Sequence, residues 1–141
     1  MNRNENEEDA APAGKSPWSG WLILPDEVVH IQQPACSGLD PAFDLSDTDT
    51  ASDWVLRCQH DLAQLWHGGE LWAVTQVVRG KRGLILQIVG MAGRYDPALL
   101  NAIESWGREI GCVRVYFTGR RGWLRREPGY KMTTVTAFKE L

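Results

Sequence analysis

A helical segment between two β-rich runs is the feature that most restricts how this chain can fold. In YDPALLNAIESWGREIG, residues 95–111, Asp96 suits an N-cap, Pro97 suits the first helical position, and Gly111 suits the end of a helix. One face carries the apolar residues Leu99, Leu100, Ile103, Trp106 and Ile110. LILQIVG, residues 84–90, precedes this helix, and VRVYFT, residues 113–118, follows it. Strand, helix and strand in this order predict a right-handed crossover with two parallel strands.

The neighbouring segments extend this prediction to an α/β (α+β) fold. From residue 52 to residue 66, apolar residues at steps of three and four predict a helix of about 14 residues, which Gly68 and Gly69 would end. Residues 71–92 read as an antiparallel hairpin with the basic turn RGKRG. Residues 120–127 favour a short helix, and residues 132–141 favour a final strand. We therefore expect a mixed, mainly antiparallel sheet with helices on both faces.

The first third of the chain differs in composition from the rest. Residues 1–17 contain no aromatic or β-branched residue, so we expect a disordered acidic tail. Residues 18–51 are expected to hold a strand in WSGWLILP, a short helix beginning at Pro25, and a loop that runs over residues 34–52. Residues 52–141 would form the core domain.

Charge is divided unevenly along the chain, although the formal net charge is only -3. Residues 1–53 contain 11 acidic and two basic side chains, whereas residues 54–141 contain seven acidic and 13 basic ones. This division is typical of a solubilising extension, or of a tail that folds onto a basic face and competes with an anionic partner. The sequence leaves both interpretations open.

Few residues suggest a metal site, a disulfide or a membrane segment. Cys36, Cys58 and Cys112 form no C-x-x-C pair, and we expect them to be reduced and mostly buried. His60 and His67 are spaced to share a helix face, but no third ligand accompanies them, so no metal is expected. No apolar run approaches the roughly 20 residues that cross a bilayer, so a soluble, intracellular protein is expected.

Three stretches carry a resemblance to a known family. "GELWAV", "LLNAIESWGREIGCVRVYFTGRRGW" and "GYKMTTVTAFKEL" resemble small phage-encoded proteins with a GNAT-like (GCN5-related N-acetyltransferase) fold, over roughly residues 52–141. The resemblance implies that, in active members, backbone amides after the central strand hold the pyrophosphate of acetyl-CoA at a helix N-terminus. The corresponding stretch here is GMAGRYDPALL, so Gly90, Gly93 and Arg94 would bind the cofactor if acetyl-CoA binding persists.

The same stretch departs from the pattern of the active enzymes. Asp96 would place a carboxylate at the anion site, and Pro97 has no N–H group to donate. Where active members often carry an acidic tyrosine, this chain has Trp123; Tyr116 and Tyr130 are off the pattern. Glu70 is a candidate base, but its Gly-Gly-Glu context favours an exposed turn. The sequence therefore yields no convincing catalytic residue.

Tryptophan and arginine dominate the remaining candidates. Trp54, Trp66 and Trp106 fall on apolar helix faces, and we expect them in the core together with Trp123. Around Trp123, four arginines are predicted to form an interaction surface for a protein or a nucleic acid: Arg120, Arg121, Arg125 and Arg126.

These features support three functional hypotheses. The main one is a non-catalytic GNAT-like phage protein without cofactor, which contacts other phage structural proteins in the host cytoplasm during infection and in the virion. The alternative is an acetyl-CoA-dependent N-acetyltransferase. The third is a small regulator that binds a host protein or DNA.

Overall fold

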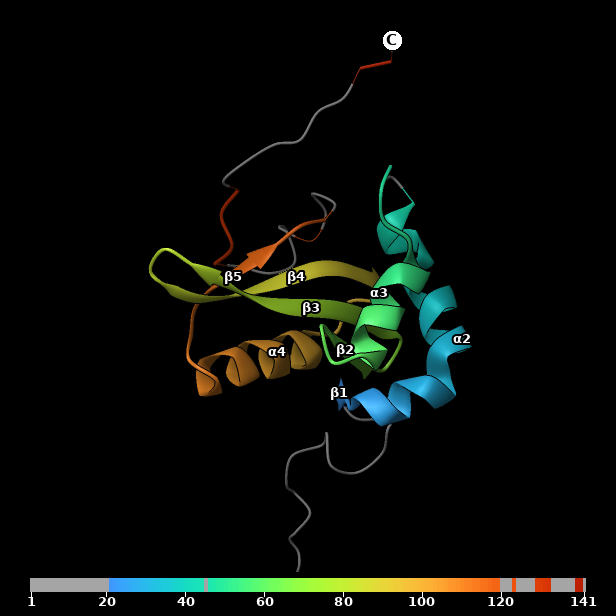
Figure 1. Ribbon diagram of the computed structural model, residues 1–141. Helices are drawn as coiled ribbons and strands as arrows, with labels where there is room; N and C mark the ends of the chain where they lie inside the picture. The colour runs from blue at the N-terminus through green and yellow to red at the C-terminus, as the bar shows by residue number, and fades with distance from the viewer. Residues whose placement is uncertain (1–20, 45, 120–122, 124–128, 133–138, 141) are drawn as a thin grey trace, which may run out of the picture.

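A five-stranded sheet forms the centre of the molecule (Figure 1). The computed structural model describes residues 21–44, 46–119, 123, 129–132 and 139–140. The strands lie in chain order in the sheet: β1 (Leu22–Ile23), β2 (Gln64–Gly68), β3 (Leu71–Gly80), β4 (Gly83–Gly93) and β5 (Cys112–Phe117). Neighbours pair antiparallel except β4 and β5, which are parallel. The predicted hairpin and the predicted parallel pair are both confirmed.

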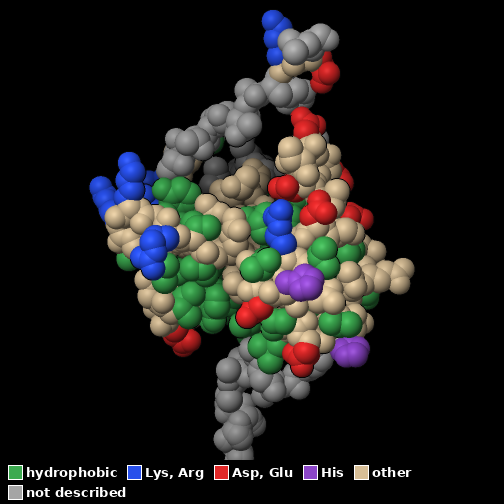
Figure 2. Space-filling view, viewed as in Figure 1, with side chains coloured by type: hydrophobic (Ala, Val, Ile, Leu, Met, Phe, Trp, Pro, Cys, Tyr) green, Lys and Arg blue, Asp and Glu red, His purple; other side chains and the backbone are tan. Residues whose placement is uncertain are grey.

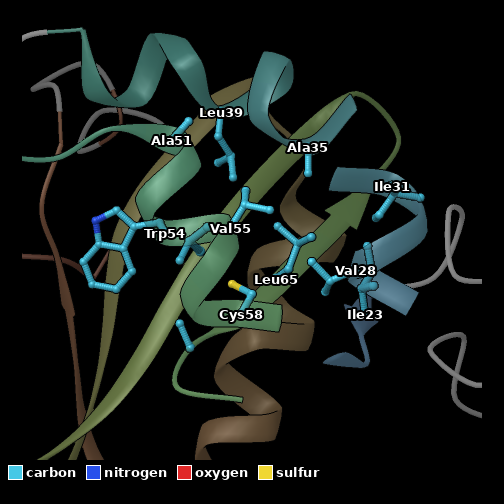
Figure 3. Packing of buried hydrophobic residues seen from close by; sticks show 12 residues of the cluster. Ile23, Val28, Ile31, Ala35, Leu39, Ala51, Trp54, Val55, Cys58 and Leu65 are labelled. Carbon is cyan, nitrogen blue, oxygen red and sulfur yellow. The ribbon is translucent and has the colours of Figure 1, made fainter. Parts of the chain in front are cut away.

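Helices cover both faces of this sheet, as the sequence predicted. Helices α2 (Pro25–Phe43) and α3 (Ala51–Gln59) pack on one face, and α4 (Pro97–Glu109) packs on the other (Figure 1). Strand alternation separates the two cores, because Leu65 and Val74 face α2 and α3, whereas Trp66 and Ala73 face α4. Figure 3 shows side chains of the first core gathered between β1, α2, α3 and β2, with the Trp54 ring at one side.

The loop predicted for residues 34–52 is wrong over its first half. Helix α2 continues to Phe43, although Pro34 and Pro41 lie inside it. A break at Ile31, with φ -117° and ψ 18°, divides α2 into two helical pieces, so Pro34 falls in the first turn of the second piece, where a missing N–H is tolerated. Ala35 and Leu39 are fully buried in that piece, and their packing holds it against the sheet.

The helix predicted for residues 52–66 is also too long. Helix α3 begins with a capping box, in which Asp53 N donates to Thr50 Oγ1 at 3.1 Å and Thr50 N donates to an Asp53 side-chain oxygen at 3.3 Å. The helix ends at Gln59, and Asp61 adopts the left-handed conformation with φ 60°. Leu65 and Trp66 therefore belong to β2, where they point to opposite faces of the sheet.

Trp54, Trp66 and Trp106 lie in the core, as the sequence predicted. Trp54 and Trp66 are buried, and the half-buried Trp106 meets Trp66 edge to face at 5.6 Å between ring centroids. Trp66 reaches this position from a strand and not from a helix. Its Nε1 donates to Thr75 Oγ1 at 2.9 Å, and Thr75 donates to Gln64 Oε1 at 2.8 Å. The buried Trp66 N–H and Thr75 hydroxyl are therefore both satisfied.

The acidic tail, most of the short helix predicted for residues 120–127 and most of the final strand lie outside the described residues. Among the helices that are described, none is long and apolar enough to cross a membrane.

Candidate functional site

Strands β4 and β5 separate partway along β4. Their pairing runs from Leu84 opposite Cys112 to Ile88 opposite Phe117, and a last backbone bond joins Thr118 N to Ile88 O at 3.1 Å. Strand β4 then continues to Gly93 with β3 as its partner. Within the described part of the chain, residues 89–93 have no strand on the side that β5 occupied.

A β-bulge marks the point of separation. Val74 pairs with Gly90 and Thr75 pairs with Ile88, so Val89 is the extra residue in β4. A bulge bends its strand and changes the local twist. The bulge at Val89 therefore comes directly after the last pair with β5, at Ile88. Backbone groups of a strand edge beyond such a point can pair with another extended chain.

The predicted cofactor residues Gly90, Gly93 and Arg94 lie at this end of β4. A Cβ atom on Gly90 would lie 3.0 Å from Phe43 Cζ and 3.1 Å from Ala42 Cβ, so the close approach of α2 favours a glycine here. Gly93 has φ 113°, and a Cβ there would overlap the carbonyl oxygen of Glu70. Packing alone accounts for both glycines. Arg94 follows them with an exposed side chain.

At the N-terminus of α4, the first backbone N–H groups are already hydrogen-bonded to Asp96. The Asp96 side chain accepts a hydrogen bond from Ala98 N at 3.0 Å, and the Asp96 carbonyl accepts from Leu99 N at 3.1 Å. Pro97 has no N–H to offer, and Leu100 N bonds to the Asp96 carbonyl at 3.4 Å. A helix N-terminus binds an anion through unpaired N–H groups. The Asp96 cap occupies that site with a carboxylate of the chain itself.

An aromatic cluster lies between β5 and the start of α4. The Trp123 ring lies 6.2 Å from that of Tyr95 and 6.4 Å from that of Phe117, measured between centroids. Tyr95 precedes α4 and Phe117 ends β5, so Trp123 joins the two elements that flank the separation of the strands. Trp123 is half-buried and packs against the second core, as the sequence predicted.

The acid and base candidates from the sequence do not come together. Glu70 is exposed in the turn between β2 and β3, as its glycine context indicated. Tyr116 lies on β5 with 38% of its surface exposed, whereas the Tyr130 hydroxyl hydrogen-bonds to Glu104 at 2.8 Å. No local pattern could have indicated this last pair, because its members lie 26 residues apart.

His60 and His67 lie in different secondary-structure elements, and the three cysteines are free thiols. His60 caps the end of α3, and His67 lies in β2 and stacks on Trp72 at 3.8 Å between ring centroids, so the predicted common helix face is wrong. Cys36, Cys58 and Cys112 are free thiols. Burial raises the pKa of Cys58 to about 12, and burial also raises the pKa of Cys112, so both thiols are protonated at neutral pH.

Comparison with known proteins shows which fold this architecture represents. No family model matches the sequence, and no curated protein matches it. A ribosomal-protein-alanine N-acetyltransferase from Brucella melitensis biovar Abortus 2308 superposes with a TM-score of 0.58, over 84% of this chain and 96% of that chain, at 10% sequence identity. The chain has a GNAT-like fold.

A second solved structure with the GNAT-like fold agrees with the first. A GNAT family acetyltransferase from Staphylococcus aureus subsp. aureus matches at a TM-score of 0.51 and 15% identity, over 85% of this chain and 96% of that chain. Identities this low show the shared fold and leave the activity to be inferred.

The four predicted contact residues, Arg120, Arg121, Arg125 and Arg126, lie outside the described residues, so the interaction surface around Trp123 stays a prediction.

Proposed function

We propose that this chain is an N-acetyltransferase that binds an acyl-CoA along the open edge of β4. One observation carries the proposal: in a fold shared with acetyltransferases, β4 extends past its last pair with β5, and among the described residues no strand pairs with residues 89–93 on that side. The pantetheine arm of an acyl-CoA is an extended chain with amide groups. Such a chain satisfies an open strand edge as an added strand does.

The diphosphate of the same ligand fits less well. At the N-terminus of α4 it would meet the Asp96 carboxylate and would find the first N–H groups already bonded. Arg94 is exposed between β4 and α4 and offers the cation nearest in sequence to this helix end. The arm would therefore supply most of the binding energy and the diphosphate rather little. In the reaction, an amine nitrogen would attack the thioester carbonyl, the C–S bond would break, and a proton from the amine would end on the released thiol.

A second candidate function is non-catalytic binding through protein contacts. It is favoured by the Asp96 cap, because this cap fills the place where a helix N-terminus would receive a diphosphate. Under this candidate the fold is a scaffold only. The role in a phage particle or its assembly belongs to this candidate and rests on the sequence resemblance.

Calorimetry with two ligands separates the candidates. We expect acetyl-CoA to bind, and we expect S-acetylpantetheine, which lacks the nucleotide and diphosphate, to bind within about tenfold of it, a difference of about 1.4 kcal/mol. Release of free thiol from acetyl-CoA in the presence of small amines would report transfer. If neither ligand gives heat or a thermal shift, the acetyltransferase proposal is wrong and the non-catalytic candidate stands.

A further inference from the structure

Part of the sheet face on the side of α2 and α3 is left open by the described helices. Helix α2 meets this face near Trp72, where a Cβ on Gly38 would overlap the indole, and near Gly90, where Phe43 and Ala42 pack. Both positions lie at the same end of the β3–β4 pair. The hairpin extends from there away from α2 and α3, and α4 lies on its opposite face (Figure 1).

Strand register determines which side chains form this open region. Leu86 and Ile88 face α4, so the residues that alternate with them face the other way. Gln76 lies opposite Gln87, and Val78 lies opposite Ile85, all half-buried. On the neighbouring strand β5, Arg114 is aligned with Ile85 and Tyr116 with Gln87. We call this set the β5 face: Gln76, Val78, Ile85, Gln87, Arg114 and Tyr116.

The β5 face combines the aromatic ring of Tyr116, the guanidinium group of Arg114 and the side-chain amides of Gln76 and Gln87. The Arg114 guanidinium lies 5.9 Å from the centre of the Tyr116 ring, and Nη1 donates to the Tyr116 hydroxyl at 3.4 Å. Gln76 Nε2 donates to Gln87 Oε1 at 2.7 Å. Nucleic-acid bases stack on exposed tyrosine rings and on guanidinium planes, and amide groups hydrogen-bond to base edges.

The strands and turn that form the β5 face contain basic residues and no acidic ones. Residues 71–94 and 112–119 include no acidic residue, and their basic residues are Arg79, Lys81, Arg82, Arg94 and Arg114. Arg79, Lys81 and Arg82 are exposed at the turn between β3 and β4. Figure 2 shows basic side chains gathered at the hairpin end of the molecule, with acidic ones over the helices. This charge complements a polyanion.

We propose that the β5 face binds single-stranded nucleic acid. Bases would stack on Tyr116 and Arg114, while phosphates would contact the basic turn between β3 and β4. A single strand fits better than a duplex, because its bases are free to lie on a flat sheet face. It also fits better than an acidic protein, because a purely electrostatic partner would make no use of the ring and the amide pair.

Fluorescence anisotropy with a labelled oligothymidylate tests this proposal on the full chain. We expect Tyr116→Ala to weaken binding about tenfold or more and Tyr116→Phe to retain most of it, because stacking needs the ring and not the hydroxyl. The pair Lys81→Ala and Arg82→Ala should lower the salt slope of log K by about 0.7 for each phosphate that the variant no longer neutralises. Arg108→Ala, an exposed arginine on α4, is the matched control and should leave binding unchanged.

The same experiment also tests whether this face binds an acidic protein or a duplex instead. If polyglutamate competes as well as unlabelled oligothymidylate and Tyr116→Ala binds normally, the surface recognises acidic protein and the proposal is overturned. Equal affinity for a duplex, or no binding at low salt, overturns it as well. Thermal unfolding of each variant shows whether a weaker signal reflects an unfolded protein.

Discussion

Trp123 connects the end of β5 to the beginning of α4. Its ring contacts Tyr95 and Phe117 on either side of the strand separation, and it remains half-buried. Trp123→Ala should lower the free energy of unfolding by about 2 kcal/mol, below the roughly 3 to 5 kcal/mol typical of fully buried aromatic residues. Urea denaturation measures this change, with the exposed Arg108→Ala as control. An unchanged midpoint would show that Trp123 contributes no packing to the core.

Among the helices and strands, sequence reasoning worked best where local signals agreed with one another. Helix α4 was predicted with its Asp96 cap and its end at Gly111, because cap, proline and apolar face all indicated the same element. The α3 helix was predicted too long, because Leu65 and Trp66 fit a helical spacing and equally fit alternation on a strand. Only their tertiary partners decide between the two, and these partners lie on other elements.

The candidate site was predicted only in part, for a related reason. The sequence placed Gly90, Gly93 and Arg94 at the end of a strand, but it could not show that helix packing favours a glycine at position 90 and that strand packing requires one at position 93. Nor could it reveal the bulge at Val89, since a bulge depends on the register between two strands. The end of the β4–β5 pairing at Ile88 is therefore a finding of the three-dimensional arrangement.

The N-terminus of α4 offers a test of where the diphosphate lies. Asp96→Asn keeps a good N-cap, so stability should change by only a few tenths of a kcal/mol. It removes the negative charge, so the affinity for acetyl-CoA should rise about two- to fivefold if the diphosphate passes near this helix end. Calorimetry with S-acetylpantetheine should show no such gain. Glu109→Gln at the other end of α4 is the matched control, and an equal gain there would contradict a local effect.

At the scale of the whole molecule, the two proposed binding surfaces lie in different places. The strand separation opens toward the start of α4, whereas the β5 face lies toward the turn between β3 and β4. Because the basic residues of that turn lie at the opposite end of β4 from residues 89–93, variants there should leave acetyl-CoA binding unaffected. The two proposals can therefore fail independently.

Hydrogen–deuterium exchange of the backbone reports directly on whether the open edge of β4 holds an acyl-CoA. With acetyl-CoA at about 100 times its Kd, amides of residues 89–93 that exchange only from the free state should slow by up to about 100-fold. Residues 79–84, at the β3–β4 turn, should exchange at their original rate and serve as the internal control. Unchanged exchange in residues 89–93 under saturating acetyl-CoA would contradict binding at this edge.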